Sequence, residues 1–191
     1  MKNIDTIEKL LIVVDMVKGF VDEGNMADRY IGHITEGIEN KVKEYIANGD
    51  GVMFFNDTHS VDCAEFKKFP PHCIAGTSES ELVDELMPYQ YDGILYRKNS
   101  TSSMFAEGFM EDIDSMSELK EVTITGCCSD ICVVNLAIPL SCYFDQQDRE
   151  VKINVPVNLI ETYDAPYHPR DEYNAIAVKL MNQAGINTEE M

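Results

Sequence analysis

Three residues of types that carry out covalent chemistry each stand where an apolar, strand-like run ends or just beyond it. Asp15 closes the run Leu10–Val14, and a carboxylate at the end of a buried strand is suited to general-base work because partial burial raises its proton affinity. Cys132 lies in the first turn of a predicted helix after Gly126, where the positive end of the helix dipole favours a thiolate. Lys98 ends a third run, and a lysine that lies near both Asp15 and Cys132 would stabilise the carboxylate and the thiolate.

Each of these three residues also has a plainer interpretation. Acidic and basic side chains are mostly solvated, so Asp15 could be a cap or surface charge and Lys98 a surface lysine. A free cysteine such as Cys132 is usually a small buried apolar residue. That plainer interpretation is the one adopted for three other cysteines, Cys63, Cys73 and Cys142.

A second set of residues has the composition of a metal site. Asp57 and His59 are two positions apart and can reach one ion from an irregular loop, and His72 follows two prolines further along. Two imidazoles and a carboxylate form a ligand set that suits Zn, Fe or Mn. Glu65, between the two histidines, is a candidate for a further oxygen ligand, against the alternative of an exposed loop glutamate. No role is predicted for the two remaining histidines, His33 and His168.

Apolar runs alternate with helical patterns from one end of the chain to the other, which is typical of an α/β sheet. The strand-like segments are Leu10–Val14, Val52–Phe55, Ile94–Tyr96, Val122–Thr125 and the alternating stretch Val151–Ile160. Apolar spacings of three and four predict helices over Ile31–Ile46, Leu82–Met87, Val133–Leu140 and Tyr173–Met181, the third kinked or shortened by Pro139. Because crossovers in such sheets are right-handed, the strand-to-helix loops open at the carboxyl ends of the strands, and the chemistry should collect there.

Length and composition predict one globular domain covering residues 1–191. Apolar residues make up 45% and charged residues 26%, which is ordinary for a folded protein. The formal charge of -19 repels phosphate backbones and anionic head groups, which argues against nucleic acid and membrane surfaces as partners. The longest apolar run is too short to span a bilayer, and Met1–Asp5 lack the basic start of a secretory signal, so we expect a cytoplasmic protein with reduced cysteines.

Four motifs stand in order along nearly the whole chain. They are Leu11–Phe20, which carries an aspartate with an aromatic residue five positions later; Asn56–His59 with Phe69–Thr77; Lys98 with Phe105; and Gly126–Val133. Together they resemble the isochorismatase-like cysteine hydrolase superfamily and, within it, the nicotinamidases. Two positions depart from the family pattern: Ser102-Ser103-Met104-Phe105 stands where Tyr-Ser-Ala-Phe is usual, and Phe69 stands where an indole often stacks on the substrate ring.

This resemblance implies a three-layer α/β/α fold around a six-stranded, mainly parallel sheet. It implies a catalytic triad of Asp15, Lys98 and Cys132, and one divalent metal ion that binds a pyridine nitrogen. The implied metal ligands are Asp57, His59 and His72. Backbone N–H groups of Cys128 and Cys132 are implied to hold the substrate oxygen, next to a cis peptide between Cys127 and Cys128. The aromatic residues implied to enclose the substrate ring are Phe20, Phe69 and Phe105. Members of the superfamily are often homo-oligomers, and we expect the same here.

The expected reaction is hydrolysis of a small amide, most simply nicotinamide to nicotinate and ammonia, through a thioester on Cys132. Asp15 takes the thiol proton and passes it to the departing nitrogen, and Lys98 keeps Asp15 and the thiolate anionic in the resting state. Three alternatives stay open: a metal-bound hydroxide as the attacking group, another amidase acting on a carbamoyl or ureido compound, and a non-catalytic metal or thiol sensor on the same scaffold.

Overall fold

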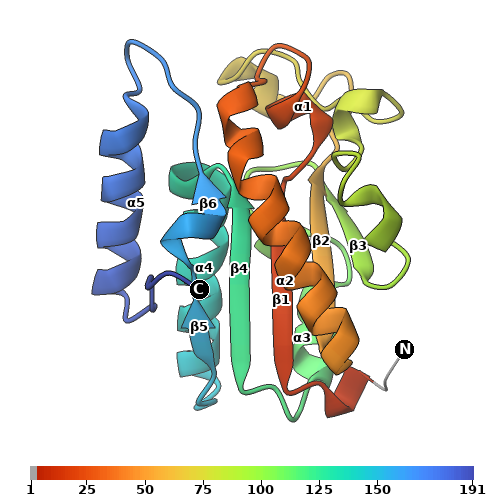
Figure 1. Ribbon diagram of the computed structural model, residues 1–191, viewed down its shortest axis with the longest axis vertical. Coiled ribbons are helices and arrows are strands. Elements are labelled where there is room, and N and C mark those ends of the chain that lie inside the picture. The colour runs from red at the N-terminus through yellow and green to blue at the C-terminus, as the bar shows by residue number, and fades with distance from the viewer. Residues whose placement is uncertain (1–3) are drawn as a thin grey trace.

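Six strands form one sheet in which all strand pairings are parallel, and the computed structural model describes residues 4–191 (Figure 1). The strand order is β3-β2-β1-β4-β5, and β6 pairs with the carboxyl end of β4. The strands are β1 Lys9–Val14, β2 Gly51–Asp57, β3 Ile94–Lys98, β4 Glu121–Cys127, β5 Lys152–Asn154 and β6 Ile160–Glu161. Residues 1–3, part of the segment compared above with a secretory signal, lie outside the described residues.

Helices cover both faces of the sheet, which gives three layers (Figure 1). The helices are α1 Lys18–Val21, α2 Thr35–Asn48, α3 Phe109–Ser115, α4 Val134–Gln146 and α5 Arg170–Gln183. Alternate residues of β1 point to opposite faces of the sheet and belong to two separate hydrophobic cores. Leu11 and Val13 pack with α2, whereas Leu10, Ile12 and Val14 pack with α3, α4 and α5. The predicted three-layer α/β/α fold is therefore confirmed. Among the described residues, no helix is long and apolar enough to cross a bilayer.

The helix predicted over Leu82–Met87 is wrong. The backbone there pairs with the chain that follows β1: the N–H of Val83 donates to the carbonyl of Met16 at 3.0 Å, and Glu81 accepts from Lys18 at 2.9 Å. These long-range bonds hold the start of the segment against the chain that follows β1, and the apolar side chains of Leu82, Val83 and Leu86 still become buried. Helix α3, which the sequence did not predict, supplies two buried residues, Phe109 and Ile113, to the core.

The single strand predicted over Val151–Ile160 is instead two short strands. β5 pairs with the first half of β4 and β6 with its end, and the turn Val157–Leu159 separates them. Pro156 precedes that turn, and a proline has no N–H to donate to a neighbouring strand. The alternation of apolar residues therefore correctly predicted strand structure at this edge of the sheet, but it did not reveal the turn that divides the segment into two strands.

Pro139 lies inside α4 without ending it. A proline leaves the carbonyl four residues earlier without its helical partner, and here that carbonyl belongs to Asn135. The hydroxyl of Ser102 donates to it at 2.7 Å. Because this contact replaces the missing helical bond, α4 continues for seven residues past Pro139, to Gln146.

Gly126 lets two central strands approach closely at the carboxyl end of the sheet. It pairs with Val14, the residue before Asp15, and it has a positive φ of 111°. A Cβ at this position would lie 2.0 Å from the carbonyl oxygen of Val14. Only glycine fits there, so this residue sets the separation between Asp15 and the turn that carries Cys132.

We expect Gly126→Ala to lower the free energy of unfolding by about 3 kcal/mol or more, because backbone strain and a backbone clash add. Gly185→Ala is the matched control: its φ is also positive, at 81°, but its Cβ would meet open space, so a loss of about 1 kcal/mol is expected. Urea unfolding followed by circular dichroism measures both. Equal losses would show that close approach at Gly126 does not constrain the sheet.

Candidate active site

The ammonium group of Lys98 lies buried between two carboxylates. Its Nζ is 2.8 Å from Oδ2 of Asp15 and 2.6 Å from Oδ1 of Asp57. It also donates to the carbonyl of Ser100 at 3.2 Å and lies 3.9 Å from the sulfur of Cys132. The three residues of the predicted triad, which come from the ends of β1 and β3 and the turn after β4, therefore meet at one point.

Asp15 is held in an unusual backbone conformation at the end of β1. Its φ is +52°, in the left-handed region, its N–H donates to the carbonyl of Phe55 at 2.9 Å, and its own carbonyl accepts from the thiol of Cys127 at 3.1 Å. Such conformations persist where the surrounding structure fixes them, often at functional sites. Complete burial raises the pKa of Asp15 to about 7, against the opposing charge of Lys98. A carboxyl with that pKa is suited to exchange protons near neutral pH.

Cys132 lies in a π-helical turn, Ser129–Val133, between β4 and α4. Such turns are rare and occur frequently at functional sites. Burial raises the pKa of the Cys132 thiol well above its usual value, and the nearby charge of Lys98 offsets only part of this. This direction runs against the thiolate expected in the resting state, because the cost of removing the anion from water exceeds the stabilisation by the charge of Lys98. A neutral thiol needs a base, and Asp15 shares the ammonium of Lys98 with it.

Four residues form a cluster whose donor atoms converge next to this triad. One atom each from Asp57, His59, Glu65 and His72 lies within 4.8 Å of all the others. Oδ2 of Asp57 is 3.1 Å from Nε2 of His59 and 3.3 Å from Nε2 of His72. β2 runs two residues further than predicted and ends at Asp57, so the carboxylate belongs to the last residue of a strand and the sheet fixes its position.

Both histidines of the cluster are oriented by acceptors on their Nδ1 atoms. Nδ1 of His72 lies 2.8 Å from the carbonyl of Pro70, and Nδ1 of His59 lies 3.1 Å from Oδ1 of Asn99. Each Nδ1 therefore carries a proton, and each Nε2 faces Asp57. Nε2 of His59 is buried and, among the described residues, has no partner with hydrogen-bond geometry. Two imidazole nitrogens and a carboxylate that converge in this way fit a divalent cation. Metal-binding histidines usually donate their other ring N–H to an acceptor, as both histidines do here.

The charges of the cluster are balanced around Asp57. Burial raises the pKa of Asp57, but Lys98 and the two histidines outweigh this and hold that pKa below its usual range. Burial lowers the pKa of His59, but the close contact with the negative charge of Asp57 outweighs it and raises that pKa to about 9. Without a bound metal, a proton on His59 therefore balances the carboxylate.

A small cavity lies between Cys132 and the metal cluster. Phe20 and Phe69 line it together with Asp57, Glu65, His72, Cys128, Cys132, Met26 and Ile131. Sequence reasoning missed Met26, a residue of a loop, and Ile131, although its position directly before Cys132 was an available signal. The peptide between Cys127 and Cys128 is cis, as the family resemblance implies.

Phe105 does not line this cavity, so the expectation that its ring helps to enclose the substrate is wrong. Its side chain is 81% exposed, whereas its neighbour Ser103 is fully buried. Both belong to one short 3-10 turn, Ser103–Phe105, in which side chains two positions apart point to different sides.

The three cysteines given no catalytic role and His168 differ in their surroundings. Cys63 and Cys73 are buried, as predicted, but Cys142 is exposed on α4. His168, for which no role was predicted, is buried, with its ring stacked between those of Tyr163 and Tyr173. Its Nε2 lies 2.9 Å from Oδ2 of Asp130, a residue of the turn that carries Cys132.

The sequence profile of the isochorismatase domain matches residues 9–183. The chain belongs to the isochorismatase family. Nicotinamidase 1 of Arabidopsis thaliana is 34% identical over 137 residues, a match that covers 64% of this chain and 56% of that protein. This chain therefore matches little more than half the length of that relative.

Solved structures show the same fold at lower identity. The nicotinamidase PncA from Bacillus subtilis superimposes with a TM-score of 0.80 at 24% identity, covering 96% of this chain and all of that one. The pyrazinamidase of Pyrococcus horikoshii, solved in complex with zinc, gives a TM-score of 0.76 at 18% identity, covering 96% of this chain and 99% of that one.

Proposed function

We propose that this protein is a cysteine-dependent amidase that converts nicotinamide to nicotinate and ammonia. One observation carries the proposal: a thiol, a carboxyl with a pKa near 7 and a buried ammonium meet at the mouth of a cavity whose opposite wall is the metal cluster. The likeness to Nicotinamidase 1 of Arabidopsis thaliana supports the choice of substrate.

In the first half of the proposed reaction, Asp15 accepts the thiol proton of Cys132 while the sulfur attacks the carboxamide carbon. The oxyanion is held by backbone N–H groups of Cys128 and Cys132, and each such donor typically contributes about 3 kcal/mol to transition-state stabilisation. Asp15 then gives its proton to the departing nitrogen, and ammonia leaves. Lys98 stays protonated and stabilises the negative charge that moves between Asp15 and Cys132.

In the second half, Asp15 takes a proton from water as the water attacks the thioester carbonyl. The C–S bond breaks, the sulfur regains a proton from Asp15, and the carboxylic acid product leaves and loses its remaining proton to solvent. The same carboxyl group serves as base and acid in both halves, so no histidine is needed for proton transfer.

The cavity explains how a small aromatic amide would be oriented. Phe20, Phe69 and Met26 provide apolar surface against which a flat ring can pack. A divalent ion (Zn, Fe or Mn) held by Asp57, His59, His72 and Glu65 would supply a Lewis-acid site for the ring nitrogen. The two histidines favour a pyridine carboxamide over a carbamoyl or ureido substrate.

We expect the metal-loaded protein to release ammonia from nicotinamide, and Cys132→Ala to lower kcat by a factor of about 1,000 or more, as for other covalent nucleophiles. Cys142→Ala is the matched control, since that cysteine is exposed on α4, and it should retain wild-type activity. A coupled ammonia assay on pyridine carboxamides and ureido compounds measures all three proteins. Near-normal turnover by Cys132→Ala would favour a metal-bound hydroxide, and no ammonia from any carboxamide would end the assignment.

The pH dependence of kcat/KM should follow Asp15, whose pKa is raised to about 7 by burial. Asp15 can accept the thiol proton only when it is deprotonated, so kcat/KM should rise about tenfold per unit of pH up to about pH 7 and then level off. Asp15→Asn should abolish this limb together with the activity. Metal content measured at each pH controls for loss of the ion, and a limb near pH 4 with metal retained would contradict the role of Asp15.

A further inference from the structure

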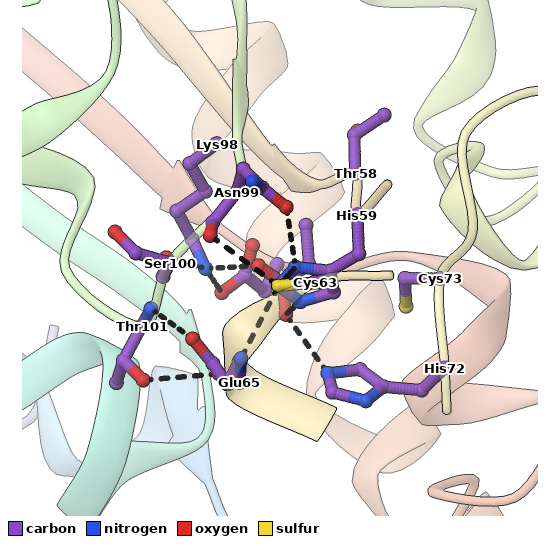
Figure 2. A network of polar contacts seen from close by, with 12 residues as sticks. Thr58, His59, Cys63, Glu65, His72, Cys73, Lys98, Asn99, Ser100 and Thr101 are labelled. Atoms are coloured by element: carbon purple, nitrogen blue, oxygen red, sulfur yellow. Dashed lines mark hydrogen bonds and ion pairs between the residues drawn. The ribbon is translucent and has the colours of Figure 1, made fainter. Parts of the chain in front are cut away.

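The three residues that follow Lys98 reach across to the metal cluster (Figure 2). We call this segment, Asn99–Thr101, the strap. One end is fixed by β3, and the carbonyl of Lys98 also accepts from the N–H of Thr58 at 2.8 Å. The carbonyl of Ser100 accepts from the ammonium of Lys98. The strap therefore leaves the sheet at a defined position between the triad and the cluster.

Asn99 makes two contacts that fix the orientation of its side-chain amide. Its Oδ1 accepts from the backbone N–H of Ser60 at 3.2 Å and faces Nδ1 of His59 at 3.1 Å. The bond from Ser60 requires that the oxygen, and not the NH₂ group, points this way. Nδ1 of His59 then donates to Asn99, and the lone pair of Nε2 is directed into the cluster. Asn99 thus selects the tautomer and the ring orientation that a metal ligand needs.

Thr101 holds a second residue of the cluster. Its N–H donates to one carboxylate oxygen of Glu65 at 3.0 Å, and its hydroxyl donates to the other at 3.1 Å. A carboxylate has about four acceptor positions, so Glu65 retains lone pairs for a cation. Figure 2 shows these two bonds on one side of Glu65. Glu65 lies in the short 3-10 helix Ala64–Lys67, and without these bonds its long side chain would lose much conformational entropy on binding a metal.

We propose that Asn99 and Thr101 are positioning residues that pre-organise His59 and Glu65 to bind a divalent metal ion. The proposal rests on the metal site of the proposed function and deepens it, because it assigns the metal affinity in part to residues that touch no metal. Asn99 itself is exposed, so a purely structural role would predict little consequence from its loss.

The test is a Zn²⁺ titration of metal-free protein against a chromophoric chelator, with the absorption spectrum of the Co²⁺ form as a second readout. We expect Asn99→Ala to weaken Zn²⁺ binding by about 10- to 100-fold, as for other residues that orient metal ligands. Asn99→Asp keeps an oxygen acceptor for His59 and Ser60 and should restore affinity. The Co²⁺ spectrum of Asn99→Ala should differ from that of the wild type, since Nδ1 of His59 then keeps only its 3.3 Å contact with the sulfur of Cys63.

Thr101 provides an independent pair of variants. Thr101→Val removes the hydroxyl but keeps the N–H and the shape, so a smaller, several-fold loss of affinity is expected, and Thr101→Ser should restore the wild-type value. Asn187→Ala is the matched control: Asn187 bonds to Asn154 at the opposite edge of the sheet and should not change metal affinity. Thermal unfolding of the metal-free proteins should show Asn99→Ala and Asn187→Ala to be similarly stable.

Equal Zn²⁺ affinity for the wild type, Asn99→Ala and Thr101→Val would overturn the strap proposal and leave the metal site standing. A wild-type protein that binds no divalent ion would overturn both. Because ammonia release is not part of the readout, failure to hydrolyse nicotinamide would count against the proposed function alone. A graded loss of Zn²⁺ affinity with rescue by Asn99→Asp would support the strap proposal whether or not nicotinamide is the substrate.

Discussion

One buried ion, the ammonium of Lys98, is the constraint on which the rest of the site depends. A charge removed from water is tolerated only when partners replace its hydration, and here two carboxylates and a carbonyl do so. Asp57 and Lys98 are paired directly across β2 and β3, and Asp15 directly follows β1, the next strand in the sheet. The parallel register of three adjacent strands therefore sets the geometry of the ion pairs.

Asp57 joins the two halves of the site through its two oxygens. Oδ1 accepts from Lys98, and Oδ2 faces the two histidines. The position of anything bound at the cluster is thus fixed relative to the sulfur of Cys132 by one carboxylate and one ammonium. The cavity between them is short and largely apolar, so a ring held at one end presents its substituent at the other.

The sequence was sufficient to predict the fold class and to place the reactive side chains at one edge, because continuous apolar runs such as Leu10–Val14 are distinctive and parallel strands bring their carboxyl ends together. It was not sufficient where long-range backbone pairing overrides the local pattern, as in Leu82–Met87. Nor was it sufficient where a short turn decides which way a side chain points, as at Phe105. The contacts of Asn99 and of His168 depend on loops meeting in space, and a single sequence carries no signal for them.

The role of Lys98 is tested most directly by the free energy of unfolding of Lys98→Met between pH 5 and pH 8. Removing the ammonium leaves the buried carboxylate of Asp15 unpaired and that of Asp57 with only the two histidines, so a loss of about 3 to 5 kcal/mol is expected at pH 8. The carboxyl pKa values of the folded variant are then raised, so the folded state binds protons that the unfolded state does not, and the deficit should shrink as the pH falls. Lys98→Met/Asp15→Asn should recover part of it at pH 8. A variant as stable as the wild type at every pH would show that Lys98 does not hold the site together.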